Sequence, residues 1–178
     1  AVKGLQMCMT QNELQEFVLE VQMIAALEHT HIVRVHDFGV DGDTSFLVMD
    51  YAPHGSLRHK HAKRIPLPLA TIVPYVKQIA AALQYAHDQK LIHRDIKPEN
   101  MLLGKHNDVL VSDFGLAVVA RSTRSWEEQK IAGTAPYMSP EHFRANAFPA
   151  SDQNSLRVPV SAWLNVSPPL DSGNFMPF

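Results

Sequence analysis

The stretch Leu91–Leu103 restricts what this 178-residue chain can become more than any other part of it. It places Asp95, Lys97 and Asn100 within six residues, between two apolar pieces that have the composition of short strands. A second acid, Asp113, follows Asn100 by thirteen residues, at the end of another apolar piece. Carboxylate and amide oxygens are the ligands that Mg²⁺ prefers. The sequence therefore indicates a polar, metal-compatible site built on loops between short apolar elements.

The composition excludes several classes of protein. A formal net charge of -2 gives no case for a nucleic-acid partner or for binding to a membrane surface. The single cysteine, Cys8, excludes an internal disulfide and suits a reducing compartment, so a cytoplasmic location is expected. No apolar run approaches the length of a membrane span, although an anchor in a longer parent protein stays open. The chain begins at Ala1 rather than at a methionine, and we expect a fragment.

Two amphipathic helices are predicted. Thr10–Glu13 is a capping-box pattern that opens the first helix, and Glu20 lies at the edge of its apolar stripe. The stripe has helical spacing and consists of Leu14, Phe17, Val18, Val21, Ile24 and Ala25. The second helix runs from about Leu69 to Asp88, with Pro74 near its start, where a missing amide donor costs least. Its apolar positions Ile72, Val76, Ile79 and Leu83 predict a core helix.

Shorter elements surround these helices. Ala1–Leu5 is predicted to be the end of a strand, and two further strands are predicted at His31–Val35 and at Ser45–Tyr51. The Pro/Gly break at Ala52–Gly55 is the best candidate for a hinge between two lobes. The basic run Arg58–Arg64 could suggest a metal or phosphate patch, but a solvated loop is the favoured interpretation.

The C-terminal part is harder to interpret. Residues 118–132 lose all periodicity, which is typical of a mobile loop. The stretch Ser151–Trp163 has some helical spacing, but Pro159 falls inside it and is expected to break or kink the helix. Residues 167–178 have an irregular composition.

Three motifs occur in order and identify a family resemblance. They are His93-Arg94-Asp95, Asp113-Phe114-Gly115 and Ser139-Pro140-Glu141, with Lys3 and Glu20 upstream. From Lys3 to about Gln153 the chain resembles the eukaryotic-like, bacterial Hanks-type serine/threonine protein kinases. The resemblance implies an α+β, two-lobed kinase fold that is truncated at both ends. Residues 1–51 would form a partial N-lobe with its third strand, helix C and fourth and fifth strands. Residues 52–178 would form a partial C-lobe with helix E, the catalytic loop, the activation segment and a degenerate helix F and tail.

The resemblance also implies catalytic roles. Phosphoryl transfer requires positioning and charge neutralisation more than covalent chemistry. Asp95 would be the catalytic base that accepts the proton of an incoming hydroxyl. Lys97 would neutralise charge on the transferring group. Lys3 would be the lysine of the third strand, which holds the inner phosphates while it is paired with Glu20 on helix C.

ATP and Mg²⁺ are the cofactors that this resemblance implies. Asn100 and Asp113 would be the metal ligands. The nucleotide-binding residues by similarity are Met49 as gatekeeper, Asp50 to Ala52 as the adenine-contacting hinge, and Ala1 and Leu102 on the two faces of the adenine ring.

Protein substrates with serine or threonine are implied by Lys97 together with Thr134. Arg94 beside Asp95 is the arrangement found where a phosphorylated activation loop docks onto an arginine. The candidate phosphosites are Ser122, Thr123 and Ser125, on placement alone; phosphopeptide mapping that found all three unmodified in an active preparation would refute them.

The sequence also departs from the family pattern. No Gly-rich loop precedes Lys3, and Ser139 replaces the usual alanine of its motif. Asp152 matches the helix-F aspartate that braces the catalytic loop, and the incomplete large lobe predicts poor stability of the chain alone. A second reading is therefore an inactive remnant, acting as a pseudokinase-like binding module or a truncated gene product. A third, a small-molecule phosphotransferase, is disfavoured by Lys97–Glu99 and by the stretch Gly133–Glu141.

Overall fold

A computed structural model describes residues 1–6, 11–41, 44–61, 65–114 and 149–164 of the chain. Their elements, in order, are β1 (Val2–Gln6), α1 (Gln11–Ala25), β2 (Val35–Asp41), β3 (Thr44–Met49), α2 (Leu57–Lys60), α3 (Leu69–Asp88), the 3₁₀ turn η1 (Pro98–Asn100), β4 (Met101–Leu103), β5 (Val109–Val111) and α6 (Pro149–Leu164). The expectations for residues 118–132, for Thr134, for Ser139–Glu141 and for the three candidate phosphosites lie outside the described residues.

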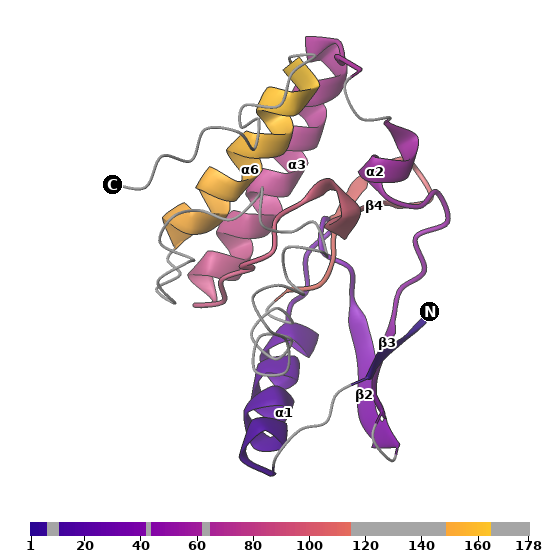
Figure 1. Ribbon diagram of the computed structural model, residues 1–178, viewed down its shortest axis with the longest axis vertical. Coiled ribbons are helices and arrows are strands. Elements are labelled where there is room, and N and C mark those ends of the chain that lie inside the picture. Colours follow the sequence, from indigo (N-terminus) through magenta and orange to yellow (C-terminus); the bar gives the residue numbers. More distant parts are fainter. Residues whose placement is uncertain (7–10, 42–43, 62–64, 115–148, 165–178) are drawn as a thin grey trace, which may run out of the picture.

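An antiparallel sheet with the strand order β1-β3-β2 forms one part of the molecule, and α1 packs beside it (Figure 1). The apolar stripe predicted for α1 is its buried face, since Phe17, Val21 and Ile24 are all buried. Leu19 and Met23, on the other side of the helix, are exposed. Gly39 on β2 allows the ring of Phe46 on β3 to lie across it, because a Cβ atom there would meet that ring at 2.5 Å. The apolar spacing of α1 thus determines which of its faces is buried, and Gly39 permits the close packing of β2 and β3.

Two of the predicted strands were wrong. Strand β2 begins at Val35, so residues 31–34 precede this strand instead of forming it. They pair with β5 instead: Ile32 forms an isolated bridge with Val111, and the Val33 amide donates to the Val111 carbonyl at 2.9 Å. The apolar piece that starts at Leu91 is not a strand either, because the amide of His93 donates to a side chain from a distant helix.

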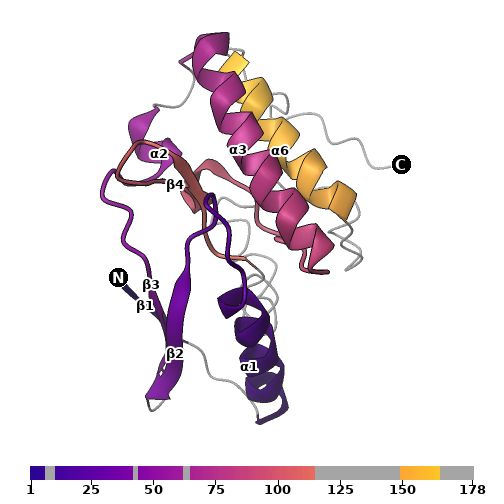
Figure 2. The same ribbon diagram turned by 180° about the vertical axis from the view of Figure 1, so that it is seen from behind.

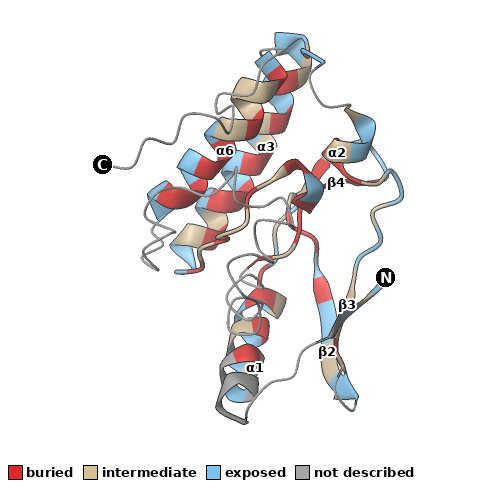
Figure 3. Ribbon diagram, viewed as in Figure 1, coloured by how far each residue is buried: buried red, intermediate tan, exposed pale blue. Residues whose placement is uncertain are grey.

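Helices α3 and α6 lie side by side in the second part of the molecule (Figures 1 and 2). Helix α3 has the predicted bounds, and buried residues alternate with exposed ones along both helices (Figure 3). Helix α6 continues through Pro159, so the expected break does not occur. A proline removes one main-chain hydrogen bond, and here its ring is buried along with Leu156 and Trp163. The packing of that face outweighs the lost bond.

Sheet and helices are thus largely segregated, which makes the fold α+β, as predicted. The short hairpin of β4 and β5 lies between the two parts and contacts α2 and α3. Gly55, in the segment that joins the two parts, has a φ of 69°, a backbone conformation that favours glycine. The division of the chain at residues 51 and 52 stays a prediction. None of the described helices is long and apolar enough to cross a membrane.

Candidate active site

His93 anchors the loop that follows α3. Its side chain is fully buried, and its ring packs against the ring of Phe114 at a centroid distance of 4.5 Å. Nε2 donates a hydrogen bond to the Ser112 carbonyl at 2.9 Å, and Nδ1 accepts one from the Asp95 amide at 3.1 Å. One nitrogen donates and the other accepts, which is the pattern of a neutral imidazole. The loop is therefore fixed to the segment that leads into Asp113.

Asp152 of α6 holds the same loop from the other side. Its buried carboxylate accepts hydrogen bonds from the backbone amides of His93 and Arg94, each at 2.8 Å, and from His87 Nε2, also at 2.8 Å. The prediction that Asp152 braces the catalytic loop is thus confirmed. Arg94 has a φ of 68°, an uncommon conformation for a residue with a side chain. The clamp therefore holds strained backbone in place.

The pKa of Asp152 is lowered from its ordinary value. Burial alone would raise that pKa, but the hydrogen bond from His87 and the two backbone amides outweigh it. A carboxylate whose pKa is lower in the folded chain stabilises the fold above its unfolded pKa of about 3.9. That contribution is lost as the pH falls through the folded pKa.

His87→Ala is expected to move acid unfolding to a higher pH. The substitution removes a hydrogen bond that lowers the pKa of Asp152, so this carboxylate becomes protonated earlier as the pH falls. Far-UV circular dichroism followed from pH 7 to pH 2 measures the midpoint. His106→Ala is the matched control, since His106 is exposed and its ring makes no contact with this carboxylate. An unchanged midpoint in His87→Ala would contradict the assignment.

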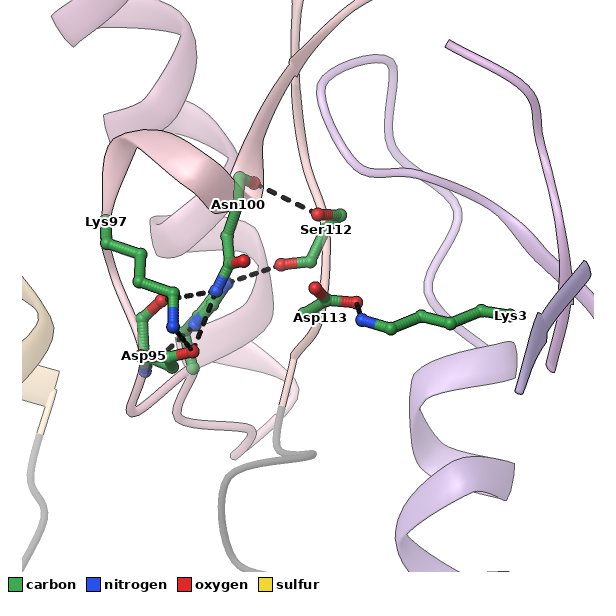
Figure 4. A network of polar contacts seen from close by, with 7 residues as sticks. Lys3, Asp95, Lys97, Asn100, Ser112 and Asp113 are labelled. Atoms are coloured by element: carbon green, nitrogen blue, oxygen red, sulfur yellow. Dashed lines mark hydrogen bonds and ion pairs between the residues drawn. The ribbon is translucent and has the colours of Figure 1, made fainter. Parts of the chain in front are cut away.

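The side chains of Asp95, Lys97 and Asn100 converge on one another, as Figure 4 shows. Asp95 Oδ2 contacts Lys97 Nζ at 2.7 Å and accepts a hydrogen bond from Asn100 Nδ2 at 2.9 Å. Asn100 Nδ2 also donates to the main-chain carbonyl of Asp95 at 2.8 Å. Asp95 Oδ1 is buried and has no hydrogen-bond partner among the described residues. One carboxylate oxygen is thus fixed, and the other retains its capacity to accept a proton.

Asp113 lies next to this group and is connected to it through Ser112 (Figure 4). The Ser112 amide and hydroxyl both donate to the carbonyl of Asn100, at 2.9 and 3.2 Å. Asp113 itself has a φ of 65°, and its Oδ1 forms an ion pair with Lys3 Nζ at 2.7 Å. The structure therefore brings Lys3, from β1, to the same site as the two loops.

The predicted ion pair between Lys3 and Glu20 is not the one that the structure shows. Lys3 contacts Asp113, while Glu20 Oε1 lies 3.6 Å from Arg94 Nη1. Each of the four side chains is partly exposed, so these pairs are solvent-screened and contribute little to stability. Lys3 is thus paired with the carboxylate of the Asp113 loop and Glu20 with the catalytic-loop arginine. Arg94 was expected to bind a phosphorylated activation loop. In the structure its guanidinium group contacts Glu20, so a phosphate group would have to compete with this carboxylate.

The residues expected to contact a nucleotide lie beside β1, on β3, in the segment after β3 and on β4. Ala1 and Met49 are adjacent, since their main-chain groups hydrogen-bond across β1 and β3. Asp50 and Ala52 follow β3 in the connecting segment, and the Asp50 amide donates to the Arg34 carbonyl at 3.0 Å. Leu102 lies on β4, in the other sheet.

A metal ion would find oxygen donors here, but few of them. No group of three or more His, Cys, Asp or Glu that could hold a metal occurs among the described residues. Asn100 donates from its amide nitrogen in both contacts with Asp95, which leaves its amide oxygen as the atom suited to a cation. With the Asp113 carboxylate this gives two protein ligands. Such a set fits Mg²⁺, which keeps several waters and shares its ligands with phosphate oxygens.

Sequence reasoning missed two residues and one ion pair of this site. His87 and Ser112 were not singled out, and the ion pair between Arg58 Nε and Glu99 Oε1, at 2.7 Å, was not foreseen. Ser112 immediately precedes Asp113, and that position was the available signal for it. His87 is one of ten histidines, and its partner lies 65 residues away. No local pattern points to such a contact.

A family model described as the protein kinase domain matches residues 1–174. With the α+β fold and the site above, this match shows that the chain belongs to the protein kinase family.

The relatives that the chain resembles are themselves named as kinases, two of the three below as serine/threonine-protein kinases. The chain is 39% identical over 148 residues to serine/threonine-protein kinase PknL of Mycobacterium tuberculosis, a match that covers 83% of the chain and 37% of that protein. It is 39% identical over 122 residues to Aurora kinase A-A of Xenopus laevis, covering 68% of the chain and 29% of that protein. It is 34% identical over 139 residues to human serine/threonine-protein kinase 32B, covering 78% and 33%. The chain thus spans well under half the length of each of these relatives.

Proposed function

We propose that this chain is the catalytic part of an ATP-dependent serine/threonine protein kinase, which transfers the γ-phosphoryl group of Mg²⁺-bound ATP to hydroxyls of protein substrates. The observation that carries the proposal is how the two carboxylate oxygens of Asp95 are engaged. One of its oxygens is held by Lys97 and Asn100, and the other is buried without a partner among the described residues. A buried acceptor without a partner costs free energy, and such groups are typical of functional sites.

The side chains divide the work of the reaction between them. Asp95 Oδ1 accepts the hydrogen of the substrate hydroxyl and thereby orients its oxygen for attack. The Lys97 ammonium group lies beside that carboxylate, where it would stabilise the charge that develops during transfer. When bound, Mg²⁺ supplies the charge that neutralises the phosphate oxygens, and Asn100 and Asp113 are the residues that would hold it. Lys3, already at the site, is placed to reach phosphate oxygens.

The remaining site assignments belong to the same proposal. Met49, Asp50, Ala52, Ala1 and Leu102 would contact the nucleotide. The candidate phosphosites Ser122, Thr123 and Ser125, and the role of Thr134, rest on their positions in the sequence. A bacterial source, a role in signalling and a cytoplasmic location belong to this proposal as well.

Mg²⁺-ATP is expected to raise the thermal unfolding midpoint of the chain saturably, by roughly 5–10 °C at about 100 times its dissociation constant. Asp113→Ala is expected to lose most of this shift, because it removes one of the two protein ligands for the metal. A thermal-shift titration with Mg²⁺-ATP measures both. Asp41→Ala, an exposed position at the end of β2, is the matched control and is expected to keep the shift.

The titration also tests the proposed activity directly. A saturable shift that Asp113→Ala abolishes, followed by transfer of labelled phosphate to a serine peptide, supports the kinase assignment. The absence of any shift at millimolar Mg²⁺-ATP would contradict it for this chain.

One observation favours a second candidate, a catalytically inactive remnant that serves as a binding module. Lys3 neutralises the Asp113 carboxylate directly, at 2.7 Å, and Glu20 is engaged with Arg94. In this arrangement a cation that binds Asp113 competes with Lys3 for the same oxygen. The two candidates separate in the experiment above, because a binding module of this kind shows no Asp113-dependent response to Mg²⁺-ATP.

A further inference from the structure

The stretch of sequence that contains α2 is basic, and the catalytic arrangement makes no use of its charge. From Tyr51 to His87 the sequence contains no aspartate or glutamate, whereas the chain as a whole has a net charge of -2. The cations of this stretch are Arg58, Lys60, Lys63, Arg64 and Lys77. The basic run that starts at Arg58 was predicted to be a solvated loop, but its first residues form a helical turn.

Helix α2 is held in place by one buried side chain and by its N-terminal cap. Leu57 is fully buried, and Ser56 caps the helix by accepting a hydrogen bond from the His59 amide at 3.4 Å. His59 and Lys60 are consequently held outward and exposed. Lys60 Nζ donates to the Asn107 side chain at 3.2 Å, which ties α2 to the turn between β4 and β5.

The turn between β4 and β5 adds two more basic residues. Lys105 and His106 are both exposed and lie within two residues of Asn107. His59, Lys60, Lys105 and His106 together are called the basic surface. They come from two elements joined by a hydrogen bond, so the backbone segments that carry them are held near each other before anything binds.

The basic surface borders the catalytic loop. Helix α2 contacts η1, and Arg58 Nε forms an ion pair with Glu99 Oε1 at 2.7 Å. Glu99 directly precedes Asn100, whose amide contacts Asp95. The Glu99 carboxylate beside α2 is therefore already neutralised by Arg58. A second nearby carboxylate, that of Asp108, accepts a hydrogen bond from the His106 amide at 3.2 Å.

We propose that the basic surface docks an acidic segment of the protein substrate while Asp95 receives the substrate hydroxyl. The inference rests on the proposed kinase function, because only then is a peptide presented to Asp95. A polypeptide fits better than a nucleic acid, since the net charge of -2 opposes the approach of a long polyanion. A short surface with two lysines, flanked by the two histidines as hydrogen-bonding groups, suits a few carboxylates.

The test uses peptides that share one central serine and differ only in their flanks. Two peptides carry a run of glutamates, one before and one after the serine; the others carry glutamines or lysines. We expect one acidic peptide to exceed the glutamine peptide in kcat/KM by about 3-fold to 10-fold, mainly through KM, because each exposed ion pair contributes a factor of a few. Equal kcat/KM values for the acidic and glutamine peptides would overturn the proposal.

Charge-reversal variants test whether the preference for the acidic peptide arises from the basic surface. The double variant Lys60→Glu/Lys105→Glu is expected to abolish the preference for the acidic peptide and to leave the glutamine peptide within about twofold. Lys77→Glu makes the same type of change at an exposed position on α3 and is expected to keep the preference. A preference that survives the double variant would overturn the proposal.

A binding measurement separates this proposal from the kinase assignment. Fluorescence anisotropy with labelled peptides requires no phosphate transfer. Tighter binding of the acidic peptide, lost in Lys60→Glu/Lys105→Glu, supports the docking surface even where no peptide is phosphorylated and the kinase function fails. Tighter binding of a short oligonucleotide of equal charge would overturn the proposal in favour of a general anion site.

Discussion

Asp95→Asn is expected to lower the rate of phosphoryl transfer by about 100-fold to 10,000-fold, while the response to Mg²⁺-ATP stays nearly unchanged. The substitution keeps the size of the side chain but replaces a proton acceptor with an amide. The substrate hydroxyl then loses the partner that Asp95 Oδ1 provides, whereas the metal ligands Asn100 and Asp113 are untouched. Transfer of labelled phosphate to a serine peptide measures the rate, and the thermal-shift titration measures nucleotide binding.

Asp88→Asn makes the same chemical change at the exposed end of α3 and serves as the control. It is expected to leave both measurements unaltered. Phosphate transfer within about threefold of the parent in Asp95→Asn would show that another group accepts the proton, and the role of Asp95 would have to be abandoned.

Asp152→Ala is expected to lower the free energy of unfolding by about 3–5 kcal/mol, which is a large share of the stability of a small domain. The change leaves the buried amides of His93 and Arg94 and the His87 ring without their acceptor. Urea unfolding followed by far-UV circular dichroism measures the loss. Failure to obtain a folded transition agrees with the upper end of this range.

Asp88→Ala is the matched control for stability. Its carboxylate accepts one exposed hydrogen bond, from Gln84 at 2.9 Å, so the expected change is within about 0.5 kcal/mol. A loss of less than about 1 kcal/mol in Asp152→Ala would mean that the loop is held by other contacts.

The parts of the fold that sequence reasoning predicted well are those with long, regular patterns. Helix α3 keeps its apolar spacing over twenty residues, and its bounds were predicted correctly. Residues 31–34 fail for a physical reason: their partner Val111 lies far along the chain, and an alternating pattern does not reveal which strand it joins. Helix α6 was doubted because of Pro159, yet tertiary packing overrides the local preference there.

The site shows a similar division. The motifs placed Asp95, Lys97, Asn100 and Asp113 in one location, because short loops between fixed elements leave little freedom. The choice of ion-pair partner could not be predicted, since partly exposed ion pairs differ little in free energy.

The clamp by Asp152 has a consequence for how the chain folds during synthesis. His93 precedes its acceptor by 59 residues, so the loop emerges from the ribosome well before the residue that holds it. At about 5–20 residues per second, the interval is about 3–12 s. Throughout this time the positive-φ backbone at Arg94 lacks its carboxylate. The catalytic loop therefore cannot reach its clamped conformation during synthesis until Asp152 of α6 has emerged.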